Sequence, residues 1–461
     1  MADITSDPKQ PALTQTIGGW QIMFYGLGSM LGAGIYALIG KAASSLGNAV
    51  WLAFLMAMIG AMLTGLSYAC VGGRYAKAGG AAYVTQRGLR KPLLSYVVGI
   101  AVMMSGLTSM ATGSQAIIEQ LPKLFGWVLD PMAVKLGSIG VVFLVGCVIY
   151  RGIRESMGLN ILCTVIEAAG LIFIIAVGVR YWGGVNYLES AGDTAAGGPG
   201  SGITLALVMQ GAVLTFYSFI GFEDILNVSE EVKNPSKNVP FGLIGAMVLA
   251  TAIYMAVAIT AVSVVPWQEL AQSKGPLMDV AKKAAPWFKG IDSVYGYITI
   301  FAIGNTALLN YLMGSRLLYG MSRQGLLPAV LGKIHPRRHT PHVAIFVLFG
   351  IVTALILSGE VKQLAESTVL LLLSVFTVVN LSLVVLKRRP EEPRGGFEPP
   401  MVVPILGAIV CASLIAVRLQ SAFAGNDPAQ KTAPMIAGAT MLVSLVLYAV
   451  LKPKNPVVQE D

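Results

Sequence analysis

Charged residues are scarce in this chain of 461 residues. Asp, Glu, Lys and Arg make up 12% of it, about half of their share in soluble domains. Hydrophobic residues make up 55%, and the mean hydropathy is +0.71. A water-soluble globular enzyme and a disordered chain are both excluded, because each needs more charge than this. The net charge of +9 has to be interpreted from where the basic residues lie.

Histidine and cysteine are also rare, with three and four residues respectively. His335, His339 and His342 share one basic segment and lack the spacing of zinc enzymes, so we predict a solvated loop and no metal site. The cysteines lie in or beside apolar runs and form no CxxC pair, which predicts small buried side chains. No Walker motif occurs, and we expect no cofactor and no catalytic residue. Residues 1–11 lack the basic region of a cleaved signal peptide.

Long apolar runs fill most of the sequence. A helix needs about 20 apolar residues to cross a hydrocarbon core of ~30 Å, and continuous runs favour helices over the alternating strands of a β-barrel. Runs of this kind lie near residues 17–42, 48–72, 93–120, 134–150, 157–180, 203–229, 240–265, 292–322, 342–358, 364–386, 401–423 and 433–451. The sequence therefore predicts an all-α polytopic membrane protein with about 12 transmembrane helices and no soluble domain.

The positions of Lys and Arg predict the orientation. With the N-terminus inside, most of the 32 basic residues fall in inner loops, as the positive-inside rule requires. Both termini are therefore predicted to be cytoplasmic, in a multi-pass protein of the plasma (inner) membrane. The excess positive charge is expected to face anionic lipid of the inner leaflet, and no nucleic acid partner is predicted.

The first apolar run contains glycines that weaken a helix. Gly32, Ala33 and Gly34 lie near its middle, and two glycines weaken a helix by roughly 2 kcal/mol relative to alanine. Gly28 and Gly32 also fit the small-xxx-small pattern of closely packed helices. Spacing alone leaves both close packing and a broken helix open.

The sixth run carries a second such feature. Gly221 lies in mid-run, and the acids Glu223 and Asp224 follow it. A carboxylate within the membrane costs about 2.5–3.5 kcal/mol and faces a partner or water. We expect Asp224 to make a helix-end or loop contact. Glu230 and Glu231 are expected near the cytoplasmic face, solvated or paired with arginine, with the basic segment 333–339 as one candidate partner. The prolines that follow are predicted to end this helix and to start the next at residue 240.

Interrupted helices at corresponding positions of two halves indicate a transporter built from inverted repeats. The N-terminus of a half-helix offers free N–H groups and a positive dipole end to an anion. The free carbonyl groups of the opposite half-helix suit an ammonium group. Together they would bind a zwitterion through backbone atoms.

Four stretches resemble signatures of the amino acid–polyamine–organocation (APC) transporter superfamily. They are residues 28–36 (GSMLGAGIY), 78–84 (AGGAAYV), 221–240 and 315–328 (SRLLYGMSRQGLLP), in the order of the family. The resemblance covers about 16–450 and implies a LeuT-like five-plus-five inverted repeat with helices 1 and 6 discontinuous and two extra C-terminal helices. It divides the chain into a cytoplasmic tail 1–15, a first repeat 16–200, a second repeat 201–390, the last two helices 391–451 and a cytoplasmic tail 452–461.

The resemblance also implies a substrate site beside the two breaks. Its predicted residues are Met30, Gly32, Ala33, Gly34, Tyr217, Ser218, Ile220, Gly221 and Asn310. The N–H groups of residues 32–34 would hold a carboxylate, and the carbonyl groups of Met30, Tyr217 and Ile220 would accept the amino group. Tyr217 matches a gating aromatic position and Asn310 a specificity position. Aromatic packing of Tyr217 and a helix–helix hydrogen bond of Asn310 are the alternatives.

Two acids are candidates for coupling transport to protons, Glu167 and Glu223. Where several relatives carry a lysine that stands in for a sodium ion, this chain has Glu167. Burial penalises the charged form of a carboxyl group, so such a group can bind and release a proton. The alternative for Glu167 is a permanent structural partner. The chain also departs from its relatives at residues 68–71, which read YACV where many relatives have YAEL.

The leading hypothesis is a secondary active transporter that moves amino acids by alternating access, as a proton-coupled symporter or exchanger. A polyamine or organic amine transporter or antiporter of the same fold is the alternative. A membrane-embedded enzyme would need paired catalytic groups, and a channel would favour an oligomeric pore. The predicted partners are a small amino acid or amine, protons and the lipid bilayer. The patterns specify neither which substrate is carried nor the oligomeric state, and sodium coupling stays open.

Overall fold

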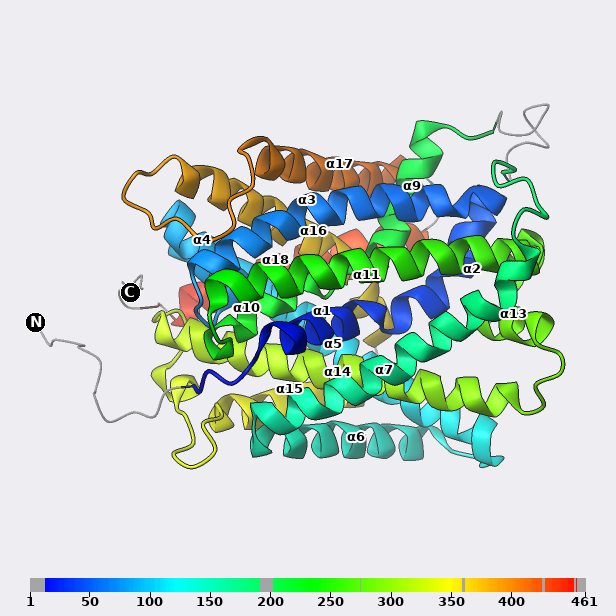
Figure 1. Ribbon diagram of the computed structural model, residues 1–461. Helices are drawn as coiled ribbons and strands as arrows, with labels where there is room; N and C mark the ends of the chain where they lie inside the picture. The colour runs from blue at the N-terminus through cyan, green and yellow to red at the C-terminus, as the bar shows by residue number, and fades with distance from the viewer. Residues whose placement is uncertain are drawn as a thin grey trace, which may run out of the picture.

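The computed structural model describes residues 13–190, 202–273, 275–358, 361–424, 428–451 and 453. Its helices lie side by side along one axis and form a bundle (Figure 1). The long helices after the first span are α3 (Val50–Arg74), α5 (Pro92–Phe125), α6 (Pro131–Arg151), α7 (Ile153–Gly178), α11 (Pro235–Val264), α14 (Ile291–Arg323), α15 (His342–Ser358), α16 (Val361–Lys387), α17 (Val402–Ala424) and α18 (Pro428–Leu451). Residues 1–12 and 454–461, which hold most of both predicted tails, lie outside the described residues.

The apolar composition of these helices suits a lipid environment. Nine helices in the described ranges are long and apolar enough to cross a membrane, and a bent pair spanning 205–219 and 222–231 makes a tenth. An all-helical, multi-pass membrane protein is thus confirmed. The first predicted run is divided into α1 (Gly19–Leu31) and α2 (Ala33–Leu46). The helix α15, with 17 residues, is shorter than the nine spanning helices.

Short helices that the apolar runs did not predict lie at both ends of the bundle (Figure 1). They are α4 (Gly80–Leu89), α12 (Trp267–Gln272) and α13 (Pro276–Ala284). The predicted start of the seventh run at residue 240 is wrong, because α11 begins at Pro235. Proline suits the first helical position, where its missing N–H has no partner to lose. Pro240 lies inside α11 and packs against Gly73 of α3.

The cysteine prediction is wrong for one residue. Cys70, Cys163 and Cys411 are buried, but Cys147 is exposed. Cys147 belongs to α6, which packs one side against α5 and α15 and carries exposed apolar side chains such as Phe143 and Leu144 on the rest of its surface. An apolar run therefore predicts burial in the membrane, but not burial within the protein.

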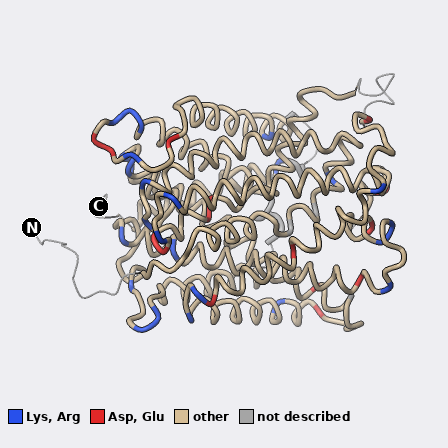
Figure 2. The backbone as a smooth tube through the Cα atoms, viewed as in Figure 1, with Lys and Arg blue, Asp and Glu red and all other residues tan. Residues whose placement is uncertain are grey.

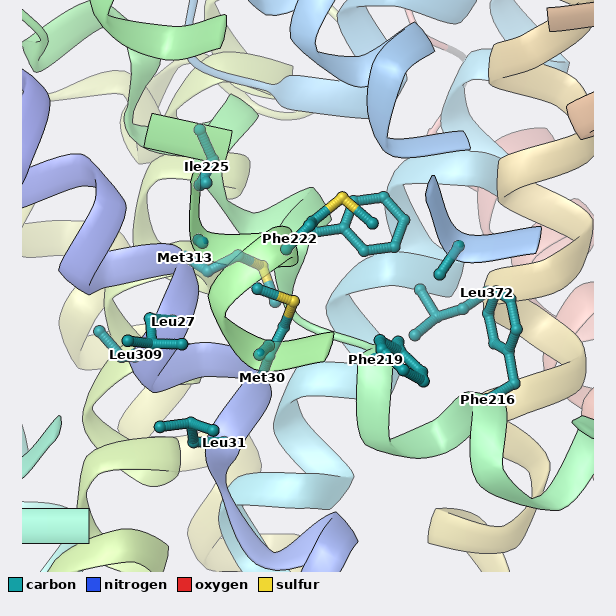
Figure 3. Packing of buried hydrophobic residues seen from close by; sticks show 14 of the residues in the cluster. Leu27, Met30, Leu31, Phe216, Phe219, Phe222, Ile225, Leu309, Met313 and Leu372 are labelled. Carbon is teal, nitrogen blue, oxygen red and sulfur yellow. The ribbon is translucent and has the colours of Figure 1, made fainter. Parts of the chain in front are cut away.

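The two interrupted spans lie at the centre of the bundle. The helix α1 packs against α7, α11 and α14. Its residues Leu27, Met30 and Leu31 share one buried cluster with Phe216, Phe219 and Phe222 of the second interrupted span (Figure 3). Charged residues gather mainly at the two ends of the bundle, and few lie in its middle (Figure 2). The few acids near the centre are therefore the candidates for function.

The segment after α16 is fixed to α3 through Glu398. Its carboxylate accepts hydrogen bonds from the Arg74 guanidinium, from Lys387 Nζ at 2.8 Å and from the N–H of Gly395 at 2.9 Å. Partial burial alone would raise the pKa of Glu398, but these donors outweigh it and lower the pKa to about 2. The ionised form of Glu398 is therefore part of the folded structure.

Candidate functional site

The first span is interrupted at Gly32. The helix α1 ends at Leu31 and α2 begins at Ala33, with Gly32 between them at φ −30° and ψ −160°. The first N–H groups of α2 and the last carbonyl groups of α1 have no intrahelical partner at such ends. A Cβ atom on Gly32 would lie 2.3 Å from Thr306 Oγ1 of α14, so only glycine fits beside that helix.

The second span is interrupted at Ile220 and Gly221. The helix α9 (Leu205–Phe216) continues as the 3₁₀ turn η3 (Tyr217–Phe219), and the chain resumes in η4 (Phe222–Asp224), α10 (Ile225–Val228) and η5 (Ser229–Glu231). The two parts are bent by 41°. Gly221 has a φ of +126°, and a Cβ atom on it would lie 2.6 Å from the Ser29 carbonyl group of α1. The two interruptions therefore touch each other directly.

Tyr254 of α11 links the two interruptions. Its hydroxyl group is within hydrogen-bonding distance of the Met30 carbonyl oxygen and lies 2.9 Å from that of Ser218. Its buried ring lies 5.3 Å from the ring of Phe219. No pattern in the sequence marks Tyr254 for this role, because it lies in an ordinary apolar run. We assign it as a positioning residue that holds both breaks.

A cavity of about 140 Å³ lies between the two interruptions. A water molecule needs roughly 10–15 Å³ of such space, so the cavity can take a small solute or several waters. Eight of the predicted site residues line it, namely Met30, Gly32, Gly34, Tyr217, Ile220, Gly221, Glu223 and Asn310. Ser218 and Glu167 are not among the lining residues, and the Ala33 side chain lies outside the described ones. Residues of α5 and α16, such as Ser109 and Thr368, complete the wall.

The polar character of the cavity comes mainly from two acids. Glu223 and Asp224 both line it, and no Lys, Arg or His is among the described lining residues. Asp224 Oδ2 accepts a hydrogen bond from Ser29 Oγ at 2.7 Å, and Glu223 Oε2 accepts one from the N–H of Gly221 at 2.8 Å. The expected helix-end contact of Asp224 occurs, with Ser29 near the end of α1, but its place in the cavity wall was not predicted. The site can neutralise a positively charged group.

Two of the predicted backbone acceptors already have donors. The Met30 carbonyl oxygen accepts from Tyr254, and the Tyr217 carbonyl oxygen accepts from the N–H of Ile220 at 3.2 Å. The Asn310 amide donates to the Thr306 carbonyl oxygen at 2.9 Å and approaches Ser109 Oγ at 3.4 Å. Asn310 therefore lines the cavity and also joins α14 to α5, so both alternatives for it have structural support.

Glu167 is fully buried in α7, away from the cavity wall. Neither of its carboxylate oxygens has a hydrogen-bond partner among the described residues, and neither does the hydroxyl group of Tyr36. Tyr36 and Tyr254 are close enough to interact electrostatically with Glu167. An isolated buried carboxylate is costly while it is charged, so the surroundings of Glu167 suit a group that takes up a proton.

The expected pairing of Glu231 with an arginine is confirmed, but the candidate segment 333–339 does not supply that arginine. Glu231 pairs with Arg316 of α14 at 2.9 Å, and both side chains are fully buried, whereas the basic segment 333–339 takes no part. The neighbouring Glu230 accepts a hydrogen bond from the N–H of Ala78 at 2.9 Å. The N–H groups of Thr16 and Ile17 donate to the Glu231 carbonyl oxygen at 3.0 Å. These contacts close the bundle at the end where the described chain begins.

A helical membrane protein with a small acidic cavity between two interrupted spans has the form of a solute transporter. The model of a family described as amino acid permease matches residues 17–448. The chain belongs to this family, which is part of the APC superfamily, and it is a transporter and not an enzyme. The predicted membership of the APC superfamily is thereby confirmed.

Curated relatives are similar over most of the chain. The methylthioribose transporter of Bacillus subtilis (strain 168) is 29% identical, over 88% of this chain and 89% of that protein. The branched-chain amino acid permease BcaP of the same organism is 27% identical, over 89% of this chain and 90% of that protein. The vacuolar cationic amino acid transporter 4 of Arabidopsis thaliana is 28% identical, over 82% of this chain and 64% of that protein.

Proposed function

We propose that this transporter carries amino acids or closely related amines by alternating access, with the substrate in the cavity between the two interruptions. The observation that carries the proposal is the composition of the cavity wall. It combines two acids, the free N–H end of α2 and no basic side chain among the described lining residues. Such a wall suits a molecule that bears an amino group and a carboxylate.

The N–H groups at the start of α2, from residues 32–34, would hold the substrate carboxylate, since a helix N-terminus stabilises an anion. The amino group would lie beside Asp224 and Glu223. The carbonyl groups of Met30 and Tyr217 are less suited to it, because each already accepts a protein donor. Tyr217 and Asn310 would contact the substrate side chain.

The acidic wall favours an amine-bearing substrate over a neutral sugar. The relatives named above carry, by their names, methylthioribose, branched-chain amino acids and cationic amino acids. A neutral solute would leave Glu223 and Asp224 without a counter-charge, which is costly in a buried site. Within the amino acids, a cationic side chain could use the second of the two acids. Polyamines and other organic amines are the second candidate class, because they too would neutralise the pair.

Proton coupling is the proposed source of driving force. Glu167 is buried without a hydrogen-bond partner among the described residues, and Glu223 lies in the cavity wall. Either could be protonated in one half of the cycle and release its proton in the other. Moving one charge across the membrane is worth about 2.3 kcal/mol per 100 mV, so a single proton would drive substantial accumulation.

The proposed architecture has twelve spans, with 16–200 and 201–390 as inverted repeats and 391–451 as two further helices. It is supported by the positions of the interruptions, which fall in the first and sixth apolar runs. The proposed setting is the plasma membrane with both termini in the cytoplasm. Lys and Arg are more numerous at the end of the bundle where the described chain begins than at the opposite end (Figure 2), which supports an orientation of this kind.

Counterflow in proteoliposomes tests the proposal. Vesicles loaded with lysine, leucine, a diamine or methylthioribose are diluted into the same radiolabelled solute at two external pH values. A carrier accelerates uptake of label when unlabelled substrate is on the far side, whereas a channel does not. We expect counterflow with at least one amine-bearing solute and not with methylthioribose.

Three variants assign the roles of the acids. Asp224→Asn should raise the KM by about tenfold to a hundredfold, because it removes a hydrogen bond to a charged group, which contributes about 1.5–3 kcal/mol. Glu167→Gln and Glu223→Gln should flatten the pH dependence of uptake. Glu119→Gln, at an exposed position of α5, is the matched control and should behave as the parent protein. Unchanged pH dependence in both Glu167→Gln and Glu223→Gln would refute proton coupling through these groups.

A further inference from the structure

A second and larger cavity lies at the end of the bundle where the described chain begins. Its volume is about 590 Å³, within the range of ligand pockets. Three separate parts of the chain line it: the α6–α7 junction, the segment between η6 (Ala329–Gly332) and α15, and the segment before α1. The lining residues are Thr14, Thr16, Tyr150, Arg151, Gly152, Ile153, Arg154, Glu155, His335, Arg337 and Arg338.

The cavity is strongly basic. Arg151, Arg154, Arg337 and Arg338 line it together with a single acid, Glu155. None of the four arginines forms an ion pair with a carboxylate of the described residues, although other arginines at this end of the bundle do. All four side chains are exposed to solvent, so their mutual repulsion is weak, and an anion bound among them would remove what remains of it. Guanidinium groups match the oxygens of phosphate particularly well.

The arginines from the α15 side are held in place. The carbonyl oxygen of Thr340 accepts from the N–H of His335 at 2.9 Å, and the Nδ1 atom of His335 accepts from the N–H groups of Arg337 and Arg338 at 3.3 and 3.2 Å. The guanidinium of Arg338 lies over the ring of Tyr150 at 5.2 Å. This tight turn fixes the backbone of both arginines, and the contact with Tyr150 orients the Arg338 side chain.

The N-terminus of α7 faces the same cavity. Gly152, its N-cap, has a φ of +157° and a ψ of 169°, a region that only glycine adopts readily. It lets α7 start directly after α6, with no side chain capping the first N–H groups of α7. The positive end of a 26-residue helix adds to the four arginines. Glu155 lies beside Gly152 and is the one acid among the described lining residues that would oppose an anion there.

The neighbouring helices are exposed along their apolar faces. Phe143 and Leu144 in the half of α6 nearer the cavity are exposed, as are Phe346 and Val347 near the start of α15. These faces suit contact with lipid chains, so a phospholipid beside α6 and α15 could reach the cavity with its headgroup. A soluble phosphate compound could enter it from the aqueous side.

We infer that this cavity is a binding site for a phosphate-bearing anion, held by Arg151, Arg154, Arg337 and Arg338 at the N-terminus of α7. The site is separate from the transport cavity and independent of which solute is carried. It is connected to the second interrupted span, because Thr16 lines the site while its N–H donates to the Glu231 carbonyl oxygen. An occupied site therefore holds the segment before α1 against that span and stabilises the closed form of this end.

Thermal unfolding of the full chain tests the inference. The parent protein is measured in neutral detergent with inorganic phosphate, and in nanodiscs of phosphatidylcholine with or without phosphatidylglycerol. The variant Arg151→Gln/Arg338→Gln is compared with Arg388→Gln/Arg394→Gln, which removes two exposed arginines without a carboxylate partner among the described residues, at the same end of the bundle (Figure 1). The control loses the same net charge but none of the cavity.

We expect stabilisation of the parent and control proteins, and binding weakened about fivefold for each cavity arginine removed, hence about 25-fold for the pair. Stabilisation by phosphatidylglycerol alone assigns the ligand as a lipid headgroup, and stabilisation by inorganic phosphate alone assigns a soluble phosphate compound. Equal responses of the two double variants, or no stabilisation of the parent protein by either anion, would overturn the inference. In that case the arginines serve only to orient the chain in the membrane.

Discussion

Replacing Tyr254 with phenylalanine isolates the link between the two interruptions. The variant keeps the ring contact with Phe219 at 5.3 Å and removes only the hydroxyl group that reaches the Met30 and Ser218 carbonyl oxygens. Losing a donor to buried carbonyl groups costs about 1–3 kcal/mol. If that energy favours one cavity geometry over others, the equilibrium between them changes by about fivefold to 150-fold.

The assay pairs thermal unfolding with the concentration dependence of transport. Tyr311→Phe is the matched control, because the Tyr311 hydroxyl also donates to one buried carbonyl group, that of Ile345, at 2.8 Å. That bond joins α14 to α15 and touches neither interruption. Both variants should lose stability, but only Tyr254→Phe should change the KM or the transport rate by fivefold or more. Equal transport by both variants would refute the role assigned to Tyr254.

Three further perturbations test other parts of the structure. Gly221→Ala should abolish transport and lower the yield of folded protein, since its Cβ would lie 2.6 Å from a carbonyl group of α1. Gly126, with a φ of +69°, has open space around it, so the control Gly126→Ala should lower the free energy of unfolding by only about 1 kcal/mol. Glu231→Gln should lower the free energy of unfolding by about 3–5 kcal/mol by leaving Arg316 buried without its partner, and Glu231→Leu combined with Arg316→Met should recover much of the loss; unfolding at equal temperatures would contradict this coupling. The folded-state pKa of Glu398 is about 2, below the unfolded value of about 4.3. Ionised Glu398 therefore stabilises the folded protein by about 1 kcal/mol after allowing for solvent screening. This contribution is present above pH 4.3 and is lost as the pH falls towards 2. Glu398→Gln should therefore be less stable than the parent protein at neutral pH, and this difference should shrink below pH 4.

The sequence predicted those features that local chemistry determines. Gly32 and Gly221 marked the positions of the breaks, because glycine weakens a helix regardless of its neighbours, but spacing alone left close packing equally open, and only the resemblance to the family favoured a break. The apolar runs located the long helices of the described residues to within about five residues, since the length needed to cross lipid is a property of the run itself. Seven of the eight predicted residues that line the cavity lie at or beside the two breaks, whereas Asn310 came from the resemblance of the eighth run to the family.

Features that depend on how distant segments meet could not be predicted. Tyr254 has no mark in the sequence, because its importance comes from two carbonyl groups on other helices. Asp224 enters the cavity only because the chain continues in a 3₁₀ turn after Gly221. Arg316 and Glu231 lie 85 residues apart in the sequence. Charge alone could not decide whether Glu231 pairs with Arg316 or with the more basic segment 333–339.

The acidic wall of the transport cavity has an electrical consequence. With Glu223 and Asp224 ionised, the empty carrier holds fixed negative charge near its centre, and each such charge that crosses the full potential contributes about 2.3 kcal/mol per 100 mV. A bound cation cancels part of that charge. An inside-negative voltage would then act most strongly on the return of the unloaded protein and would turn its cavity towards the exterior. The corresponding step of the loaded protein would depend less on voltage.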